Sequence, residues 1–331
     1  MLFSPSLLDP ELAAHHICRR AVPQDISRSR TLWERNRKLF DSETWNALPS
    51  LLKDLLMAEL ISLVIVESVR GKWPRMLGGI AFVDPKYVDE ARASSLSLHN
   101  FIFAAALRGK NPFLAPKQVA VENARGTLNL MNFFGNFGEI NLSNPELNNF
   151  YAVSNEGYRF FHFGYNFKVM WFEVIETHHA TELQAQGMHI DRQLLLPEGE
   201  SATLLRLTVE DALAHPYSRF CGLFFPPKPR FRFSSGEQML LEHALLEYSD
   251  DEARSRLNLS ADAVKKRWRS IYRKVDMAAP ELLSGTESGT ARRRTLLHHL
   301  KQHLEELRPY HEMLERNEKN KARQYPSRPQ L

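Results

Sequence analysis

Residues 233–275 read FSSGEQMLLEHALLEYSDDEARSRLNLSADAVKKRWRSIYRKV, and this stretch carries the most specific signals of the chain. Ser234 and Ser249 are each followed three residues later by glutamate, which is the spacing of a capping box at a helix start. Asn258 ends the short second helix, and Ser260 can cap a third one. The stretch therefore predicts three helices joined by tight turns.

The third of these helices has two unlike sides. Its apolar residues recur at i, i+4, i+7 and i+11, so they form one stripe that can pack against the preceding helices. They are Val264, Trp268, Ile271 and Val275. Between Val264 and Lys274 the helix carries six basic residues and no acid, namely Lys265, Lys266, Arg267, Arg269, Arg273 and Lys274. A positive face on a rigid helix fits the phosphate-lined major groove of DNA.

Two short helices before a basic third helix form the helix-turn-helix arrangement, in which the last helix enters the groove. Aligned without a gap, residues 233–275 resemble the LuxR-type helix-turn-helix of bacterial transcription regulators. The matching positions are Ser234, Glu237, Leu241, Ser249, Glu252, Leu257, Leu259, Ser260, Val264, Lys265, Ile271, Tyr272 and Lys274. The predicted core of this module consists of Leu241, Leu257, Leu259, Val264, Trp268 and Ile271.

The resemblance implies that Lys265 and its neighbours contact the backbone and the base edges of DNA. Helical spacing places Lys265, Arg269 and Arg273 on the groove-facing side, and Lys266 and Arg267 at its flanks beside phosphates. A basic cluster taken alone is usually a solvated helix face. We favour DNA binding because the caps, the lack of acids and the family pattern agree.

A proline-rich run at 226–229 punctuates the chain, because proline can continue neither a helix nor a sheet ladder. We place a linker at residues 226–233. It separates an α/β domain at residues 1–225 from the helix-turn-helix domain at 234–280, and a further helix with a polar tail follows at 285–331.

Short apolar or β-branched runs between turn signals predict strands in the first domain. They cover residues 61–66, 77–83, 127–134, 167–174 and 203–207. Helical patterns cover residues 1 to about 57, and a capped helix begins near Ser143 and runs to about Phe161. Strands interleaved with helices predict an α/β domain, a mixed sheet with flanking helices, followed by an all-α domain.

The composition is that of a folded chain without a membrane anchor. The 331 residues are 43% hydrophobic and 25% charged, which excludes collagen-like and wholly disordered classes, and a net charge of +4 names no partner. No apolar run approaches the ~20 residues of a membrane helix, and no basic leader begins the chain. We expect a cytoplasmic protein with no membrane partner, in which Cys18 and Cys221 stay reduced.

Histidines offer only weak signals. His299 and His303 stand four residues apart on the last predicted helix, but no HExxH pattern or third ligand accompanies them, so we expect a solvated pair. The same holds for His178 and His179, and we predict neither a metal nor a cofactor. The arginines at 292–294 either reach phosphates or solvate this helix, and a two-fold DNA site implies a homodimer.

The first domain leaves two alternatives open. Its order of strands and helices resembles acetyltransferase folds, in which a basic, glycine-rich turn at a helix start binds pyrophosphate. The nearest candidate, residues 134–138 (FGNFG), has the glycines but lacks the preceding arginine or glutamine, and no nucleophile motif stands out. The aromatic-rich stretch 158–172 either lines an apolar ligand pocket or fills the core.

Taken together, these signals predict a bacterial transcription regulator that is not an enzyme. It would bind double-stranded DNA through the helix-turn-helix, as a homodimer, and sense a small-molecule effector through residues 1–225. The alternative is an acyltransferase-like enzyme domain fused to the DNA-binding module.

Overall fold

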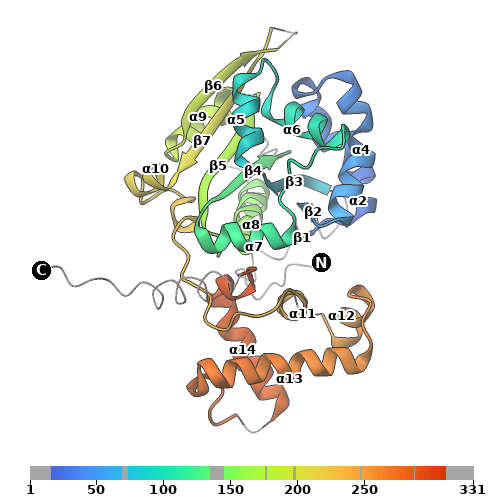
Figure 1. The fold of residues 1–331 in the computed structure, drawn as a ribbon, viewed down its shortest axis with the longest axis vertical. Coiled ribbons are helices and arrows are strands. Elements are labelled where there is room, and N and C mark those ends of the chain that lie inside the picture. Colours follow the sequence, from blue (N-terminus) through green and yellow to red (C-terminus); the bar gives the residue numbers. More distant parts are fainter. Residues whose placement is uncertain are drawn as a thin grey trace, which may run out of the picture.

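A seven-stranded mixed sheet lies at the centre of the molecule (Figure 1). The computed structural model describes residues 16–68, 74–134, 145–175, 177–196, 199–246, 248–286 and 288–310. The strands are β1 (His16–Arg20), β2 (Ile61–Ser68), β3 (Pro74–Phe82), β4 (Leu128–Phe133), β5 (Phe167–Val174), β6 (His189–Leu195) and β7 (Ser201–Thr208). Their order in the sheet is β1-β2-β3-β4-β5-β7-β6. The predicted α/β fold with a mixed sheet is therefore confirmed.

β4 and β5 form the parallel pair among the described strands, and all other neighbours are antiparallel. The two strands are paired as far as Asn132, which stands opposite Phe172. Beyond this point Phe133 is paired only with Gly79 of β3, and Glu173 only with β7. The parallel strands thus separate at their carboxyl ends and leave a fork in the middle of the sheet.

Helices cover both faces of the sheet, because successive strand residues point to opposite sides and both sets are apolar. One face packs against α2 (Pro23–Arg28), α3 (Arg30–Trp33), α4 (Ser42–Met57), α5 (Pro85–Ala93) and α6 (Leu98–Leu107). The other packs against α7 (Pro116–Arg125), α8 (Pro145–His162), α9 (Thr177–Ala185) and α10 (Val209–Ala214). The 3₁₀ helices η2 (Glu34–Leu39) and η3 (Cys221–Leu223) complete this region.

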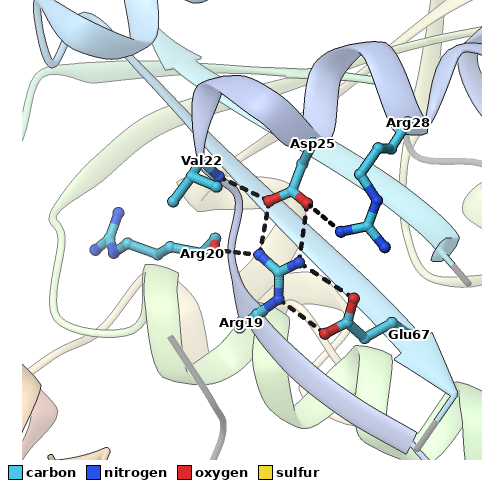
Figure 2. A network of polar contacts seen from close by, with 6 residues as sticks. All are labelled: Arg19, Arg20, Val22, Asp25, Arg28 and Glu67. Atoms are coloured by element: carbon cyan, nitrogen blue, oxygen red, sulfur yellow. Dashed lines mark hydrogen bonds and ion pairs between the residues drawn. The ribbon is translucent and has the colours of Figure 1, made fainter. Parts of the chain in front are cut away.

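β1 corrects the prediction of helix throughout residues 1–57. The strand pairs along its whole length with β2, and Arg19 fastens it to its surroundings (Figure 2). The guanidinium donates two hydrogen bonds to the carboxylate of Asp25, at 2.7 and 2.9 Å, and two to Glu67, at 3.0 and 3.1 Å. Pairing with β2 and the ion pairs of Arg19 therefore stabilise a strand that has no apolar alternation of its own.

β6 is the other strand that the sequence patterns do not predict. It lies at the edge of the sheet, and its side chains are exposed or half-buried. Such a strand needs no apolar run, because only one neighbour and little core surround it. The remaining strands coincide with predicted ones to within a few residues.

The C-terminal region is all helical, as predicted. It contains α11 (Ser235–Leu245), α12 (Asp250–Arg256), α13 (Ala261–Ala278) and α14 (Gly289–Gln302), with 3₁₀ helices η4 (Pro280–Leu282) and η5 (Leu304–Leu307). Ser234 and Ser249 form the expected capping boxes, and the Ser260 hydroxyl accepts a hydrogen bond from the Ala263 amide. The spacing of the leucines predicts that the last helix continues through Leu304, but α14 ends at Gln302 and Leu304 lies in η5.

The C-terminal helices lie beneath the sheet and share a core with it (Figure 1). One apolar cluster includes Val66 of β2, Val153 of α8 and Leu240 of α11. Arg308 is 2% exposed and donates to the backbone carbonyls of Phe160 and Phe163 at the end of α8. The domain limits at residue 225 and at 226–233 stay a prediction, and buried contacts cross them.

The expectations about the two cysteines and about membrane-spanning helices can be compared directly with the structure. Cys18 and Cys221 are both free thiols. None of the described helices combines the length and the apolar character that crossing a bilayer requires.

Candidate active site

The predicted DNA-contacting residues all lie on α13 but differ in what they touch. Four of them are exposed to solvent: Lys265, Lys266, Arg269 and Arg273. Arg267 is half-buried and donates a hydrogen bond to the carbonyl of Gly236 at 3.3 Å. Lys274 donates to the carboxylate of Glu237 at 2.7 Å and so helps to hold α11 on α13.

The predicted helix-turn-helix core residues belong to the C-terminal apolar cluster. Leu241, Val264, Trp268 and Ile271 are buried, and Leu257 and Leu259 pack against the same cluster half-buried. The indole of Trp268 donates to Asp250, and the guanidinium of Arg293 lies 4.4 Å from the ring centroid. These contacts account for the apolar stripe as packing within the helical region.

A cavity of about 810 Å³ opens at the fork between β4 and β5. Its wall includes Asn132 and Gly78, on the side of the sheet that α8 covers, and Phe133 and Glu173, which point to the opposite side. Residues from both faces of a sheet can line one cavity only where the sheet is interrupted. The cavity therefore passes through the fork.

Helix α8 contributes three polar residues to the wall, Ser154, Tyr158 and His162, spaced four residues apart on one side of the helix. The Tyr158 hydroxyl donates a hydrogen bond to the Asn132 side-chain oxygen at 2.7 Å. The Asn132 amide nitrogen donates to the carbonyl of Trp171 at 3.2 Å. The amide of Asn132 thus bridges β4, β5 and α8 and aims the tyrosine hydroxyl at the fork.

Burial sets the charge state of the α8 side chains. It raises the pKa of Tyr158 far above its usual range, against smaller lowering effects of the Asn132 hydrogen bond and the Arg219 charge. It lowers the pKa of His162 to about 3, an effect that the charge of Arg308 reinforces. The ring centroids of Tyr158 and His162 lie 4.2 Å apart. At neutral pH the site therefore presents a protonated phenol next to a neutral imidazole.

Glu173 fixes the other branch of the fork. Its carboxylate accepts hydrogen bonds from the backbone amides of Leu98 at 2.8 Å and His99 at 3.0 Å, in the first turn of α6. The His99 ring in turn makes a 2.9 Å hydrogen bond with the carbonyl of Asn132. A negative charge at a helix N-terminus is favourable, so Glu173 holds β5 against α6.

The backbone changes direction where β4 ends. Phe134 lies on the cavity wall with φ of 58°, in the left-handed region that non-glycine residues seldom adopt. Gly79 of β3 allows the Phe133 ring to lie against the strand, because a Cβ there would approach the ring to 2.3 Å. Strained backbone of this kind occurs often at functional sites.

Charged side chains stand at one side of the cavity. Arg35 and Lys38 of η2 contribute to its lining together with Glu200, and the Lys38 ammonium lies 2.7 Å from the Glu200 carboxylate. His178 and His179 both line the cavity. The sequence predicts a solvated pair, but His179 is buried. Among the described residues, no group of three or more histidines, cysteines or acids is placed to hold a metal ion.

Sequence reasoning named the aromatic stretch 158–172 without choosing between a pocket and a core. The structure contains both, since Tyr158 and Phe172 line the cavity while Phe160 is core. The signal for the site was a row of polar residues at four-residue spacing on one side of an amphipathic helix, namely Ser154, Tyr158 and His162. Within the FGNFG candidate, Phe134 lies on the wall, and residues 135–138 fall outside the described residues.

Comparison with solved structures found matches at low identity and low TM-score. An N-acyl amino acid synthase, FeeM, from uncultured soil microbes is 13% identical, with a TM-score of 0.36 over 62% of this chain and 96% of that one. An uncharacterized protein from Bacillus halodurans is 11% identical, with a TM-score of 0.32 over 64% and 92%. FdhC, a nucleotide-linked sugar GNAT, is 12% identical, with a TM-score of 0.31 over 63% and 96%. No family model and no curated protein matches the chain.

These findings overturn the identification as a LuxR-type transcription regulator. One matched protein is an N-acyl amino acid synthase and another a nucleotide-linked sugar GNAT, and none of the three is a transcription regulator by name. The predictions of a sequence-specific DNA-binding regulator and of a chain without enzymatic activity are therefore wrong. The physical reason is that capping boxes and an apolar stripe describe any three short helices that share a core. The expected partners stay predictions.

Proposed function

We propose that this chain is an acyltransferase that moves an acyl group from a thioester to an amine or hydroxyl acceptor. The observation that carries the proposal is the fork, where the parallel strands β4 and β5 part and a cavity of about 810 Å³ passes between them. In α/β sheets, ligands bind at the carboxyl ends of parallel strands. Strands that part leave backbone groups with which an extended thioester donor can pair.

The residues at the fork suit this reaction. The acceptor attacks the thioester carbonyl, a new bond to the acyl carbon forms, and the carbon–sulfur bond breaks. The acceptor loses one proton and the departing sulfur gains one, so the free thiol is released. Tyr158 stays protonated, because burial raises its pKa, so its hydroxyl can donate a proton to the departing sulfur. Asn132 accepts a hydrogen bond from this hydroxyl and so holds it at the fork, and in the transfer step the proton turns from the Asn132 oxygen to the departing sulfur. The neutral His162 ring lies beside it and adds no charge to the wall.

The experiment measures thiol release from acyl thioesters by the full chain, with and without amine acceptors. We expect acceptor-dependent release, and we expect Tyr158→Phe to lower kcat by about a hundredfold or more, the usual contribution of a positioned acid. Tyr151→Phe is the matched control, because Tyr151 lies on the same helix and is absent from the cavity wall.

Two results contradict the proposal. One is the absence of acceptor-dependent thiol release across donors and acceptors of different size. The other is a Tyr158→Phe variant with the full rate, because the protonated phenol would then have no part in the reaction. Circular dichroism of each variant separates a loss of activity from a loss of fold.

A further inference from the structure

One half of the cavity is an apolar groove between α8 and the sheet. Successive wall residues of β3 alternate, so Met76, Gly78 and Ile80 point to the side that α8 covers, and Val64 of β2 stands opposite Gly78. The hydroxyl of Ser154, on the helix side, donates back to the carbonyl of Phe150 at 2.7 Å. The groove therefore offers hydrocarbon contacts along β2 and β3, and its unpartnered polar atoms include the two ring nitrogens of His162 near the end of α8.

The groove is long enough for an extended chain. Its wall reaches from the fork at β4 and β5 across β3 to β2. Four neighbouring strands at ~4.8 Å spacing span about 14 Å. A fully extended chain advances ~3.5 Å for every three bonds, so about 14 Å accommodates roughly twelve bonds of a hydrocarbon tail.

Gly78 and Gly79 are adjacent glycines with different reasons to be glycine. A Cβ at Gly79 would collide with the Phe133 ring at 2.3 Å. A Cβ at Gly78 would meet only the Met76 methyl group, at 3.6 Å, which is ordinary contact. Glycine weakens the interior of a strand, so packing gives no reason for its presence at position 78. Because Gly78 has no side chain, the space above it in the groove stays open.

We propose that the acyl group transferred by this protein is a long unbranched hydrocarbon chain whose tail lies in this groove, and that Gly78 sets its length. The proposal rests on the acyltransferase function above and names its donor class. The thioester carbonyl would lie at the fork beside Tyr158, and the tail would run beneath α8 over Gly78 towards Val64. A larger residue at position 78 would stop the tail at β3.

The test compares acyl thioesters from acetyl to palmitoyl on the full chain. Burial of a methylene stabilises by ~0.8 kcal/mol, so kcat/KM should rise by about fourfold for each one until the groove is filled. We expect a plateau near dodecanoyl. For Gly78→Leu, the ratio of dodecanoyl to hexanoyl activity should fall at least tenfold, with hexanoyl transfer retained. Gly78→Ala, which adds only a Cβ, should fall between.

Gly222→Leu is the control for added bulk, because Gly222 is exposed and has no atoms within contact distance of an added Cβ. Equal rates for acetyl and dodecanoyl donors would overturn the inference and leave the acyltransferase function standing. An unchanged length preference in a folded Gly78→Leu variant would remove the role of Gly78.

Binding of a dodecyl thioether, which cannot be transferred, separates the two proposals. Calorimetric binding of this probe by the natural chain and its loss in Gly78→Leu, without acyl transfer from any thioester, would support the groove and contradict the acyltransferase. If the dodecyl thioether does not bind and the rate of acyl transfer does not depend on chain length, the proposed groove is contradicted and the acyltransferase function stands.

Discussion

A comparison of Arg19 in the sheet region with the solvent-facing side of α13 in the C-terminal helical region shows two different roles of basic residues. In the sheet region, Arg19 of β1 forms ion pairs with the carboxylates of Asp25 in α2 and Glu67 in β2 (Figure 2). In the helical region, Lys265 and Arg269 of α13 face solvent. Arg19 thus holds elements together, whereas these two residues of α13 only solvate their helix. A basic face on a helix consequently says little about function until its contacts are known.

Arg19→Met should give one of the largest effects. It removes the closest guanidinium from the Asp25 carboxylate, of which 1% is exposed, and leaves it the Val22 amide and the longer 3.4 Å contact with Arg28, so we expect a loss of about 3 kcal/mol in the free energy of unfolding. Urea denaturation measures this loss. A loss below about 1 kcal/mol would erase the contrast between the two regions, because such values are typical of exposed pairs.

The same variant has a pH signature. Burial tends to raise the pKa of Asp25, but hydrogen bonds from Arg19 and the Val22 amide lower it overall. A carboxyl with a lowered folded-state pKa stabilises above its unfolded value of about 3.9, and that stability is lost as the pH falls through the folded pKa. The difference between the natural chain and Arg19→Met should therefore be constant near neutrality and shrink below about pH 4.

Arg308→Met tests how the two regions are joined. The buried guanidinium donates to two backbone carbonyls of α8 and lies 5.2 Å from the Tyr165 ring centroid. Hydrogen bonds from charged groups contribute ~1.5–3 kcal/mol each, so we expect a loss of about 3 kcal/mol. Fluorescence and circular dichroism should show one unfolding transition for the natural chain and separated transitions for the variant. Coincident transitions in the variant would show that the shared apolar core suffices.

Gly79→Ala and Gly78→Ala compare packing with open space inside the sheet region. Alanine at position 79 forces the Phe133 ring to move, and overpacking of this kind costs about 2 kcal/mol. Alanine at position 78 meets no such obstacle and should change stability by less than about 1 kcal/mol, in the stabilising direction. Thermal unfolding of both variants measures the contrast, and equal destabilisation would contradict it.

The smallest effects belong to the helical region. Ser234→Ala removes the cap of α11 and should cost about 1 kcal/mol. Lys265→Ala and Arg269→Ala should each change stability by less than about 0.5 kcal/mol, because both side chains are exposed. Acyl transfer should be unchanged in the two surface variants. A drop in transfer would show that α13 takes part in the reaction.

Local signals predicted the C-terminal helices well because their causes lie close together in the sequence. A capping serine acts on an amide three residues away, as Ser249 does on Glu252, and a stripe such as Val264 to Val275 repeats with the helical period. Most strands carry their own apolar run. β1 and β6 do not, so their pairing with β2 and β7 decides them.

The site depends on contacts that no local pattern contains. Tyr158 could be noted as one aromatic residue among many, but its partner Asn132 lies 26 residues away on another element. At the fork, the backbone of Glu173 pairs with β7 and its carboxylate accepts hydrogen bonds from α6, where His99 lies 74 residues earlier in the chain. The sequence alone determined the helix caps, the apolar stripes and most strands, since these interactions act within a few residues. Only the tertiary structure decided where the sheet parts and which polar groups meet there, because those groups come from elements that folding brings together.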